Sequence, residues 1–391
     1  MLKADCTNGK LTIALSGHVD SANAPQIEKE IGELRDRHPH EEMVLDMEEL
    51  EYISSAGLRV ILRLRKAEQK LSLVNVSSAV YEILEMTGFA EMLPVQKAYR
   101  RLSVDGCEVI GQGANGKVYR LDPDTIIKVY YNPDSLPDIQ RERELARKAF
   151  VLGIPTAIPY DVVKVGDGYG SVFELLNAKS FSKLLLANPD KMDTYVGLYV
   201  DLLKTIHSTH VKPGEMPRMK DVAIGWGEFL RDYLTKEQGD KLCALIQAVP
   251  ERDTMLHGDY HTNNLMMQGD EVLLIDMDTL CVGHPIFELA SMYQGFVGFG
   301  ELDHSVTLKF LGLDYQTTGE FWRRSLKRYL NNADDETVNT VERKAALIGY
   351  ARLMRRTTRR NGLNTDDGRA VIECCRNHII EILPTVDTLD F

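Results

Sequence analysis

A short polar stretch between two apolar runs constrains the fold of this chain more than any other feature. The stretch is HGDYHTNN at residues 257–264, and it places Asp259 and Asn264 five residues apart. Twelve residues after Asn264, the apolar pair Leu274-Ile275 is followed by a second carboxylate, Asp276. A single aspartate in such a place would be an ordinary solvated turn residue, so the interpretation depends on the order and spacing of all these groups.

A glycine-rich loop, GQGANGKV at residues 111–118, precedes this stretch, and three kinds of loop resemble it. A dinucleotide-binding loop needs a helix directly after it, whereas residues 118–121 have the composition of a strand. A P-loop needs a serine or threonine hydroxyl where this chain has Val118. The GxGxxGxV loop of kinases fits at every position, and it would place Gly111, Gly113, Gly116 and Val118 around the phosphates of ATP. Taken alone, the loop could also be a plain glycine-rich hairpin.

A lysine lies inside the next predicted strand, where Ile126-Ile127-Lys128-Val129 surrounds it with apolar residues. An ammonium group in such a strand is costly to bury unless a carboxylate pairs with it. In kinases a lysine at this point binds the α- and β-phosphates and is held by a glutamate on a helix. The helix that follows offers both Glu142 and Glu144, and an ordinary surface ion pair is the alternative for each.

The glycine loop, the lysine, the Asp–Asn pair and the later aspartate occur in the order and with the gaps of kinase motifs, where the catalytic loop is H-x-D-x-x-x-x-N. In that arrangement Asp259 accepts or orients the hydroxyl proton of the phosphoryl acceptor, while Asn264 and Asp276 bind Mg²⁺, with Asp278 as a further candidate. His257 and His261 could instead face one zinc ion from a helix. The glutamate of an HExxH site is missing, however, and Gly258 disfavours a helix, so we expect His257 to support the loop backbone.

HGDYHTNN followed by LLIDMDTLCVGHPIFELA resembles the aminoglycoside phosphotransferase and choline kinase group of the protein-kinase-like superfamily, from Ile110 to about Ala290. The resemblance implies an α+β, two-lobed fold that holds ATP between a small β-rich lobe at 105–176 and a helical lobe at 177–391. It favours Glu142 as the partner of Lys128. It also implies a hinge at residues 173–176 whose backbone contacts adenine, which adds Glu174 and Leu176 to the nucleotide site.

Residues 1–97 alternate between strand-like and helix-like patterns. We expect strands at 11–15, 43–46 and 71–76 and helices at 24–37, 56–66 and 78–86, which predicts an α/β domain with a mixed sheet covered by helices. Residues 17–20, 44–46 and 52–60 resemble the STAS domain of anti-sigma-factor antagonists. The resemblance implies a protein partner and a serine that a partner kinase phosphorylates, here Ser55, although Ser54 replaces the aspartate that usually precedes it. A simple helix cap is the alternative role for Ser55.

Residues 98–104 are predicted to be a linker, because they are polar and basic without an apolar period.

The composition limits the partners and the compartment. A net charge of −12 argues against nucleic acid or an anionic membrane as the main partner. No apolar run approaches ~18 residues, the first residues lack the apolar region of a signal peptide, and the six cysteines form no CxxC pair, so we expect a cytoplasmic protein with reduced thiols. Five arginines between Arg352 and Arg360 form either a solvated helix face or the lining of a site for an acidic substrate, and the sequence does not separate these.

Two functions are compatible with these motifs. The first is an ATP- and Mg²⁺-dependent phosphotransferase that acts on a hydroxyl of a small molecule or a protein and is regulated or localised by its STAS domain. The second is a signalling scaffold that binds nucleotide without phosphoryl transfer. The presence of Lys128, Asp259, Asn264 and Asp276 together favours the first.

Overall fold

The structure is a computed structural model that describes residues 2–113 and 115–391. Met1, at the start of the predicted first domain, and Ala114, inside the glycine loop, lie outside the described residues. The chain divides into two compact units, residues 1–103 with 163–166, and residues 104–162 with 167–391. Each unit has an apolar core of its own.

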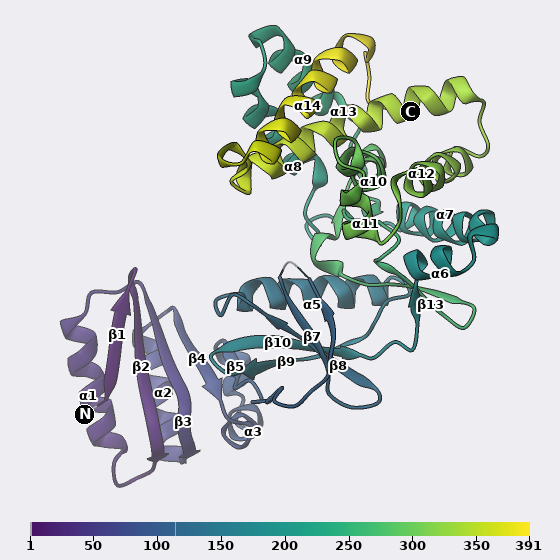
Figure 1. Cartoon of the computed structure of the whole chain (residues 1–391). Helices are drawn as coiled ribbons and strands as arrows, with labels where there is room; N and C mark the ends of the chain where they lie inside the picture. The colour runs from purple at the N-terminus through teal and green to yellow at the C-terminus, as the bar shows by residue number, and fades with distance from the viewer. Residues whose placement is uncertain (1, 114) are drawn as a thin grey trace. The chain divides into compact units, whose positions relative to one another are not determined.

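The first unit is an α/β domain with a five-stranded mixed sheet, as expected (Figure 1). The strand order is β1-β2-β3-β4-β5, in which β1 is antiparallel to β2 and the remaining neighbours are parallel. The strands are β1 (Lys3–Thr7), β2 (Lys10–Val19), β3 (Glu42–Ile53), β4 (Leu71–Val76) and β5 (Val95–Lys97). The helices are α1 (Ala24–Arg37), α2 (Ser55–Ala67), α3 (Ser78–Met86) and α4 (Phe89–Met92).

The strand that we expected to end at Asp46 is longer in the structure. β3 continues to Ile53 because its second half pairs with the second half of β2, past two register shifts in the ladder. The charged sequence of this half hid the strand. Met47 and Leu50 are buried, while the glutamates between and beside them point to the exposed side. The sequence pattern also failed to predict β1, β5 and α4, which at three to five residues are too short to show a period.

A second five-stranded sheet has the order β6-β7-β8-β10-β9, and all of it except residues 163–165 of β9 belongs to the second unit. Its strands are β6 (Val109–Gln112), β7 (Gly116–Arg120), β8 (Thr125–Tyr130), β9 (Pro159–Val165) and β10 (Gly168–Glu174). Helix α5 (Leu136–Val151) lies along this sheet (Figure 1). Close approach of β8 requires glycine at the start of β7, because a Cβ atom on Gly116 would lie 2.2 Å from the carbonyl oxygen of Val129.

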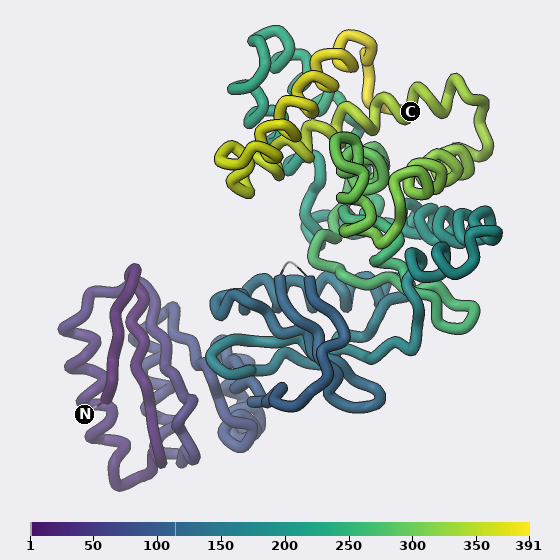
Figure 2. The backbone as a smooth tube through the Cα atoms, viewed as in Figure 1, coloured from purple at the N-terminus to yellow at the C-terminus, as the bar shows by residue number. Residues whose placement is uncertain are grey.

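The rest of the second unit is mainly helical, as the green and yellow part of the backbone trace shows (Figure 2). Helix α10 is almost entirely buried and packs against α12 and α13. The helices are α6 (Phe181–Ala187), α7 (Met192–Ser208), α8 (Met219–Leu230), α9 (Lys236–Ala248), α10 (Ile286–Phe296), α11 (Ser305–Leu311), α12 (Tyr315–Tyr329), α13 (Asp335–Arg359) and α14 (Asp366–Ile382). Short strands complete it: β11 (Lys179–Ser180), β12 (Met255–Leu256), β13 (Leu265–Gln268), β14 (Glu271–Leu274) and β15 (Cys281–Val282).

The helices of residues 2–113 and 115–391 lack membrane-spanning character. Within these ranges no helix combines the length and the apolar composition needed to cross a bilayer.

Candidate active site

The glycine loop connects β6 and β7 as a hairpin. Gly111 pairs with Val118 across this hairpin, and the amide of Gly113 donates to the carbonyl oxygen of Gly116 at 3.0 Å. A strand therefore follows the loop, as the kinase-type interpretation requires. A dinucleotide-binding loop and a P-loop would both lead into a helix instead.

Lys128 is held by carboxylates from two other segments. Its Nζ atom lies 2.9 and 3.2 Å from the two carboxylate oxygens of Glu142 on α5, and 3.1 Å from Oδ1 of Asp276. The side chains of Lys128 and Glu142 are only 18% and 6% exposed. Tyr130, two residues further along β8, donates its hydroxyl to Glu142 at 2.6 Å. The expected pairing with Glu142 is thus confirmed, and Glu144 instead forms a more exposed pair with Lys148 at 3.0 Å.

The surroundings of Lys128 keep it positively charged. Burial works to lower the pKa of its ammonium group, but the charges of Asp276 and Glu142 raise it by more, so the net shift is upward. A permanent cation therefore lies between the β-rich lobe and the segment after β14. Phosphate oxygens are suitable ligands for such a group.

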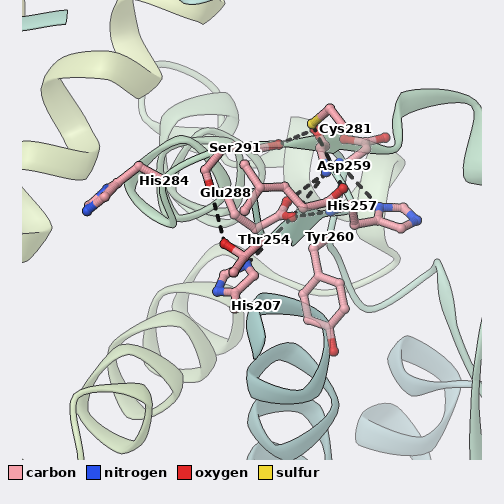
Figure 3. A network of polar contacts seen from close by, with 12 residues as sticks. His207, Thr254, His257, Asp259, Tyr260, Cys281, His284, Glu288 and Ser291 are labelled. Atoms are coloured by element: carbon pink, nitrogen blue, oxygen red, sulfur yellow. Dashed lines mark hydrogen bonds and ion pairs between the residues drawn. The ribbon is translucent and has the colours of Figure 1, made fainter. Parts of the chain in front are cut away.

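The catalytic-loop candidate, residues 257–264, is fixed by a buried glutamate that the sequence motifs did not reveal. Glu288 lies on α10 and is fully buried. Its carboxylate accepts the backbone N–H of His257 at 2.5 Å and that of Gly258 at 3.1 Å (Figure 3). From the same helix, Ser291 donates its hydroxyl to the carbonyl oxygen of Gly258 at 2.9 Å. The available signal was an acidic residue in the middle of the apolar run IFELASM.

Glycine at position 258 is required by this arrangement. Its φ angle is +83°, and a Cβ atom would lie 2.6 Å from the carbonyl oxygen of Thr279. Thr279 itself donates its hydroxyl to the carbonyl oxygen of His257 at 2.7 Å. The loop backbone is therefore held from α10 on one side and from the segment after β14 on the other.

Glu288 remains ionised although it is buried. Burial raises the pKa of its carboxyl group, but His207, whose Nε2 atom lies 3.9 Å away, and the backbone of the loop lower it by more. His207 approaches from α7, with its other ring nitrogen 2.8 Å from the hydroxyl of Tyr329. A buried carboxylate with two backbone N–H donors and a histidine beside it is electrostatically satisfied.

Asp259 lies at the accessible side of the loop, and its side chain is 41% exposed. One carboxylate oxygen lies 3.5 Å from Nε2 of His261. Burial by the surrounding protein acts to raise the pKa of Asp259. The hydrogen bond and charge of His261 lower this pKa by more, and the charge of Arg352 lowers it further, so the net pKa is well below its usual value. Asp259 is therefore an ionised carboxylate near neutral pH.

Asn264 and Asp276 are brought together by the β13–β14 hairpin. The amide of Ile275 donates to the carbonyl oxygen of Asn264 at 2.9 Å. The side-chain N–H of Asn264 donates to the backbone oxygen of Asp259 at 3.0 Å, which leaves the amide oxygen of Asn264 for another partner. Asp276 lies two residues after the end of β14 in a left-handed conformation, with φ +64°, rather than at the end of the strand.

The donor set fits a magnesium ion. An amide oxygen and carboxylates are the ligands that Mg²⁺ prefers, and Asn264 and Asp276 supply both kinds. Asp278 follows closely, and burial together with the charges of Asp276 and Glu142 raises the pKa of Asp278 to about 7. Carboxylates crowded in this way indicate a site where a cation offsets their repulsion.

The two histidines of the loop have separate partners, which does not support a shared zinc ion. His257 accepts the amide of Asp259 at 3.3 Å, and its other ring nitrogen lies 3.2 Å from the carbonyl oxygen of Ile275. This confirms the expected support of the loop backbone. His261 packs its ring against Phe310, with the centroids 4.9 Å apart.

The predicted hinge, residues 173–176, begins with the last two residues of β10 and continues past its end. Glu174 ends that strand opposite Thr125, and its amide donates to the carbonyl oxygen of Ile158 at 3.2 Å. Leu175 donates to Asp124 at 2.7 Å, and the half-buried Leu176 lies between β10 and β11. These contacts fix the strand end from which an adenine-binding backbone would extend.

In the first unit, the expected capping role of Ser55 is wrong. Helix α2 begins at Ser55, and the preceding residue, Ser54, is its N-cap. The hydroxyl oxygen of Ser54 accepts the amides of Ala56 at 3.2 Å and Gly57 at 3.5 Å. The N-cap is the residue before the first helical one. The helix was expected to begin at residue 56 but begins at Ser55, so the N-cap is Ser54. Ser55 is exposed.

Comparisons with known proteins agree with both units. Residues 106–321, more than half of the chain, match the family model described as phosphotransferase enzyme family, and residues 1–102 match that of the STAS domain. Over 98 residues the chain is 41% identical to the putative anti-sigma factor antagonist BtrV of Bordetella bronchiseptica, which covers 24% of this chain and 84% of that protein.

Solved structures share the fold of the second unit at low identity. One is a thermostable mutant of aminoglycoside phosphotransferase APH(4)-Ia in ternary complex with ADP and hygromycin B, with a TM-score of 0.50, 12% identity and coverage of 72% of this chain and 94% of that one. The chain is also similar to a choline/ethanolamine kinase family protein from Mesorhizobium loti, with a TM-score of 0.47, 14% identity and coverage of 71% of this chain and 87% of that one. The family models and the APH(4)-Ia fold lead to one conclusion: this chain belongs to the phosphotransferase enzyme family and carries an N-terminal STAS domain.

Proposed function

We propose that this protein is an ATP- and Mg²⁺-dependent phosphotransferase that moves the γ-phosphate of ATP to a hydroxyl group. The observation that carries the proposal is the pairing of Lys128 with Glu142 and Asp276, together with the hydrogen bonds that join Ile275 to Asn264 and Asn264 to Asp259. A lysine, two magnesium ligands and an ionised aspartate are the parts that phosphoryl transfer needs.

The residues divide the work by position. Lys128 binds phosphate oxygens of ATP, and Glu142 keeps its side chain in place. Gly111, Gly113, Gly116 and Val118 cover the phosphates, while the backbone around Glu174 and Leu176 binds adenine. Magnesium, held by Asn264 and Asp276, would neutralise charge on the transferring phosphate.

Asp259 orients the acceptor hydroxyl and takes its proton. A carboxylate with a lowered pKa is a weak base, so it binds the hydroxyl by hydrogen bonding before the proton moves. In the loose transition state of phosphoryl transfer, bond formation to the acceptor oxygen is late, and the proton becomes acidic only then. A strong base is therefore unnecessary, and correct positioning by Glu288 and Asn264 matters more.

The two units are proposed to be separate in function. We assign residues 1–97 to a STAS domain that regulates or localises the enzyme through a protein partner, 98–104 to a linker, and 105–176 and 177–391 to the two catalytic lobes. The likeness to an anti-sigma factor antagonist supports a protein partner for this domain. Ser55, which is exposed at the start of α2, is the proposed phosphorylation site, because a phosphate there would meet the positive end of the helix.

The proposal is tested by comparing Asp259→Asn with Asp253→Asn, a matched change at an exposed residue that pairs with His210. Both variants and the wild type should show a higher melting temperature with millimolar ATP and Mg²⁺, because a ligand of the native state stabilises it. Only Asp259→Asn should lose transfer, by about 10²–10⁴-fold, the usual contribution of an acid–base group. The acceptors are a set of hydroxyl compounds and the protein itself, with γ-labelled ATP as donor.

The outcomes separate the two functions that the sequence left open. Absence of any thermal shift would contradict nucleotide binding. A shift without transfer to any acceptor would favour the scaffold function instead. Equal loss of ATP affinity in Asp259→Asn and Asp276→Ala would show that Asp259 acts on the nucleotide rather than on the acceptor.

A further inference from the structure

The arginines near the end of α13 are not all solvated. Arg359 and Arg360 are exposed, but Arg352 and Arg356 are half-buried, four residues apart on one face of the helix. The guanidinium of Arg352 lies 5.8 Å from the ring centroid of Trp226, and that of Arg356 lies 5.0 Å from the ring of Phe299. Both positions are within the range of cation–π contact.

Neither of these two arginines has a carboxylate partner among residues 2–113 and 115–391. The Nη1 atom of Arg352 is buried and has no hydrogen-bond partner in the described part of the chain. The nearby Glu301 is already engaged, by His378 at 2.8 Å and by the hydroxyl of Tyr350 at 2.8 Å. The half-buried Lys128, by contrast, has the carboxylates of Glu142 and Asp276 beside it.

The arginine pair lies close to the candidate catalytic aspartate. From Asp259 a series of contacts leads through His261 to Phe310, then to Phe299, and so to Arg356, with ring centroids 4.9 and 5.1 Å apart along it. Helix α13 also packs directly on α10, the helix that fixes the loop of Asp259. The charge of Arg352 contributes to the low pKa of Asp259.

The arrangement costs free energy without a ligand. Burial and then the charge of Arg360 lower the pKa of the Arg356 guanidinium, the charge of Asp259 raises it by less, and the charge of Arg352 lowers it further, so the net shift is downward. Two half-buried arginines on one helix face, with their donors free, are the usual recognition element for phosphate and carboxylate groups. Arg356 also lines a hollow together with Phe299, Thr357 and the carboxylate of Glu301, which His378 and Tyr350 already engage, whereas Arg352 does not line it.

We propose that the phosphoryl acceptor is itself an anion, with a phosphate or carboxylate group that Arg352 and Arg356 bind while its hydroxyl faces Asp259. This inference rests on the proposed phosphotransferase function and specifies its acceptor. The acceptor oxygen forms a bond to the γ-phosphorus as the bond from that phosphorus to the β,γ-bridging oxygen breaks. ADP leaves, and the hydroxyl proton passes to Asp259 and then to solvent.

A polycationic acceptor, such as an aminoglycoside, does not fit this position. Each guanidinium would repel the ammonium groups of the acceptor, and among the described residues neither Arg352 nor Arg356 forms an ion pair with a carboxylate that would neutralise it. The net charge of the whole chain is −12. An anionic acceptor is therefore attracted to the arginine pair and repelled by the rest of the surface, which favours its binding at this pair.

The first test measures transfer by the full chain to matched acceptors. Glycerol and glycerol 3-phosphate, ribose and ribose 5-phosphate, and the cations choline and kanamycin are compared at saturating ATP and Mg²⁺. The anionic member of a pair should have a kcat/KM at least about tenfold higher than the neutral one, the loss expected for one charge-assisted hydrogen bond. A preference for neutral or cationic members, with ATP binding intact, would overturn the inference and leave the phosphotransferase function standing. Failure to bind ATP would count against both.

The second test decides the matter even if no compound in the set is phosphorylated. Binding of inorganic phosphate is measured by calorimetry on the full chain saturated with ADP and Mg²⁺, so that the nucleotide site is occupied. We expect the double variant Arg352→Gln/Arg356→Gln to weaken phosphate binding by about tenfold or more. Equal phosphate affinity in this variant and the wild type would refute the proposed site.

The control is Arg324→Gln/Arg343→Gln, which changes the net charge equally. Arg343 is an exposed residue of the same helix, nine positions before Arg352, and Arg324 is an exposed residue of α12. This control should bind phosphate like the wild type. Both double variants should keep the wild-type affinity for ADP and Mg²⁺, which shows that they are folded, and Arg356→Lys should retain part of the phosphate binding. A loss in the control equal to that of the test variant would mean that net charge alone attracts the anion, and the proposal would be wrong.

Discussion

Replacing Glu288 with glutamine tests whether the loop of Asp259 depends on a buried charge. The substitution keeps the size of the side chain but removes its charge and one of its two acceptor oxygens. In the structure the two oxygens together accept the N–H groups of His257 and Gly258. Glutamine has only one acceptor oxygen. Its NH2 group would take the place of the second oxygen and would face a backbone N–H, which is also a donor.

The expected cost follows from the number of bonds. One charge-assisted hydrogen bond is lost and another is weakened, and such bonds contribute about 1.5–3 kcal/mol each, so the free energy of unfolding should fall by about 3 kcal/mol. For a unit of this size the melting temperature should fall by roughly 5 °C. The value of kcat should fall by about tenfold or more because Asp259 is displaced, whereas the KM for ATP should change little.

The pH dependence gives a second check with a definite sign. The folded-state pKa of Glu288 is below its usual value, so its contribution to stability is complete above the unfolded pKa of about 4.3 and is lost as the pH falls through the folded pKa. The difference in melting temperature between the wild type and Glu288→Gln should therefore be largest near pH 7 and shrink below about pH 4.

Thermal denaturation and steady-state kinetics on the full chain measure these effects. Glu373→Gln, the same chemical change at an exposed site on α14, is the control and should leave both melting temperature and kcat unchanged. The reasoning would be refuted if Glu288→Gln melted within a degree of the wild type and kept its kcat within about twofold.

Two further changes give clear outcomes. Lys128→Met should abolish the thermal shift with ATP and Mg²⁺ and lower the stability of the unliganded protein by about 3 kcal/mol, because the buried carboxylate of Glu142 loses its cation. The double variant Lys128→Met/Glu142→Gln should regain part of the stability but none of the ATP binding. Full stability of Lys128→Met would contradict the buried pair. In the first unit, Ser54→Ala should cost about 1 kcal/mol through the lost N-cap, whereas Ser55→Ala should cost almost nothing in chemical denaturation, and the reverse order would restore Ser55 as the cap.

Several features of the fold and the site followed from sequence because they depend on local order. The alternation of Leu11, Ile13 and Leu15 predicted β2, and the pattern of residues 24–37 predicted α1 with its observed bounds. The resemblance to the phosphotransferase group favoured Glu142 over Glu144, and the helix face gives the physical reason. Glu142 lies on the same helix face as Ile139 and Leu145, so it is carried inward with them.

The role of Glu288 was decided only by the tertiary structure. It acts on His257, 31 residues earlier in the chain, and nothing in the local sequence connects the two. Similarly, β3 reaches Ile53 through a charged segment because β2 supplies its hydrogen bonds, not because its residues favour a strand. Contacts between distant segments override local propensity in both cases.

The arginines of α13 show most clearly which properties the sequence determines and which depend on the tertiary structure. The sequence determined that residues 352–360 are rich in arginine and helical, but a helix of this composition can be solvated on every side. The tertiary contacts of Arg352 with Trp226 on α8 and of Arg356 with Phe299 cover these two arginines, whereas Arg359 and Arg360 are exposed. The spacing of residues along a chain fixes which side chains share a helix face, whereas burial and charge environment depend on which distant segments cover that face.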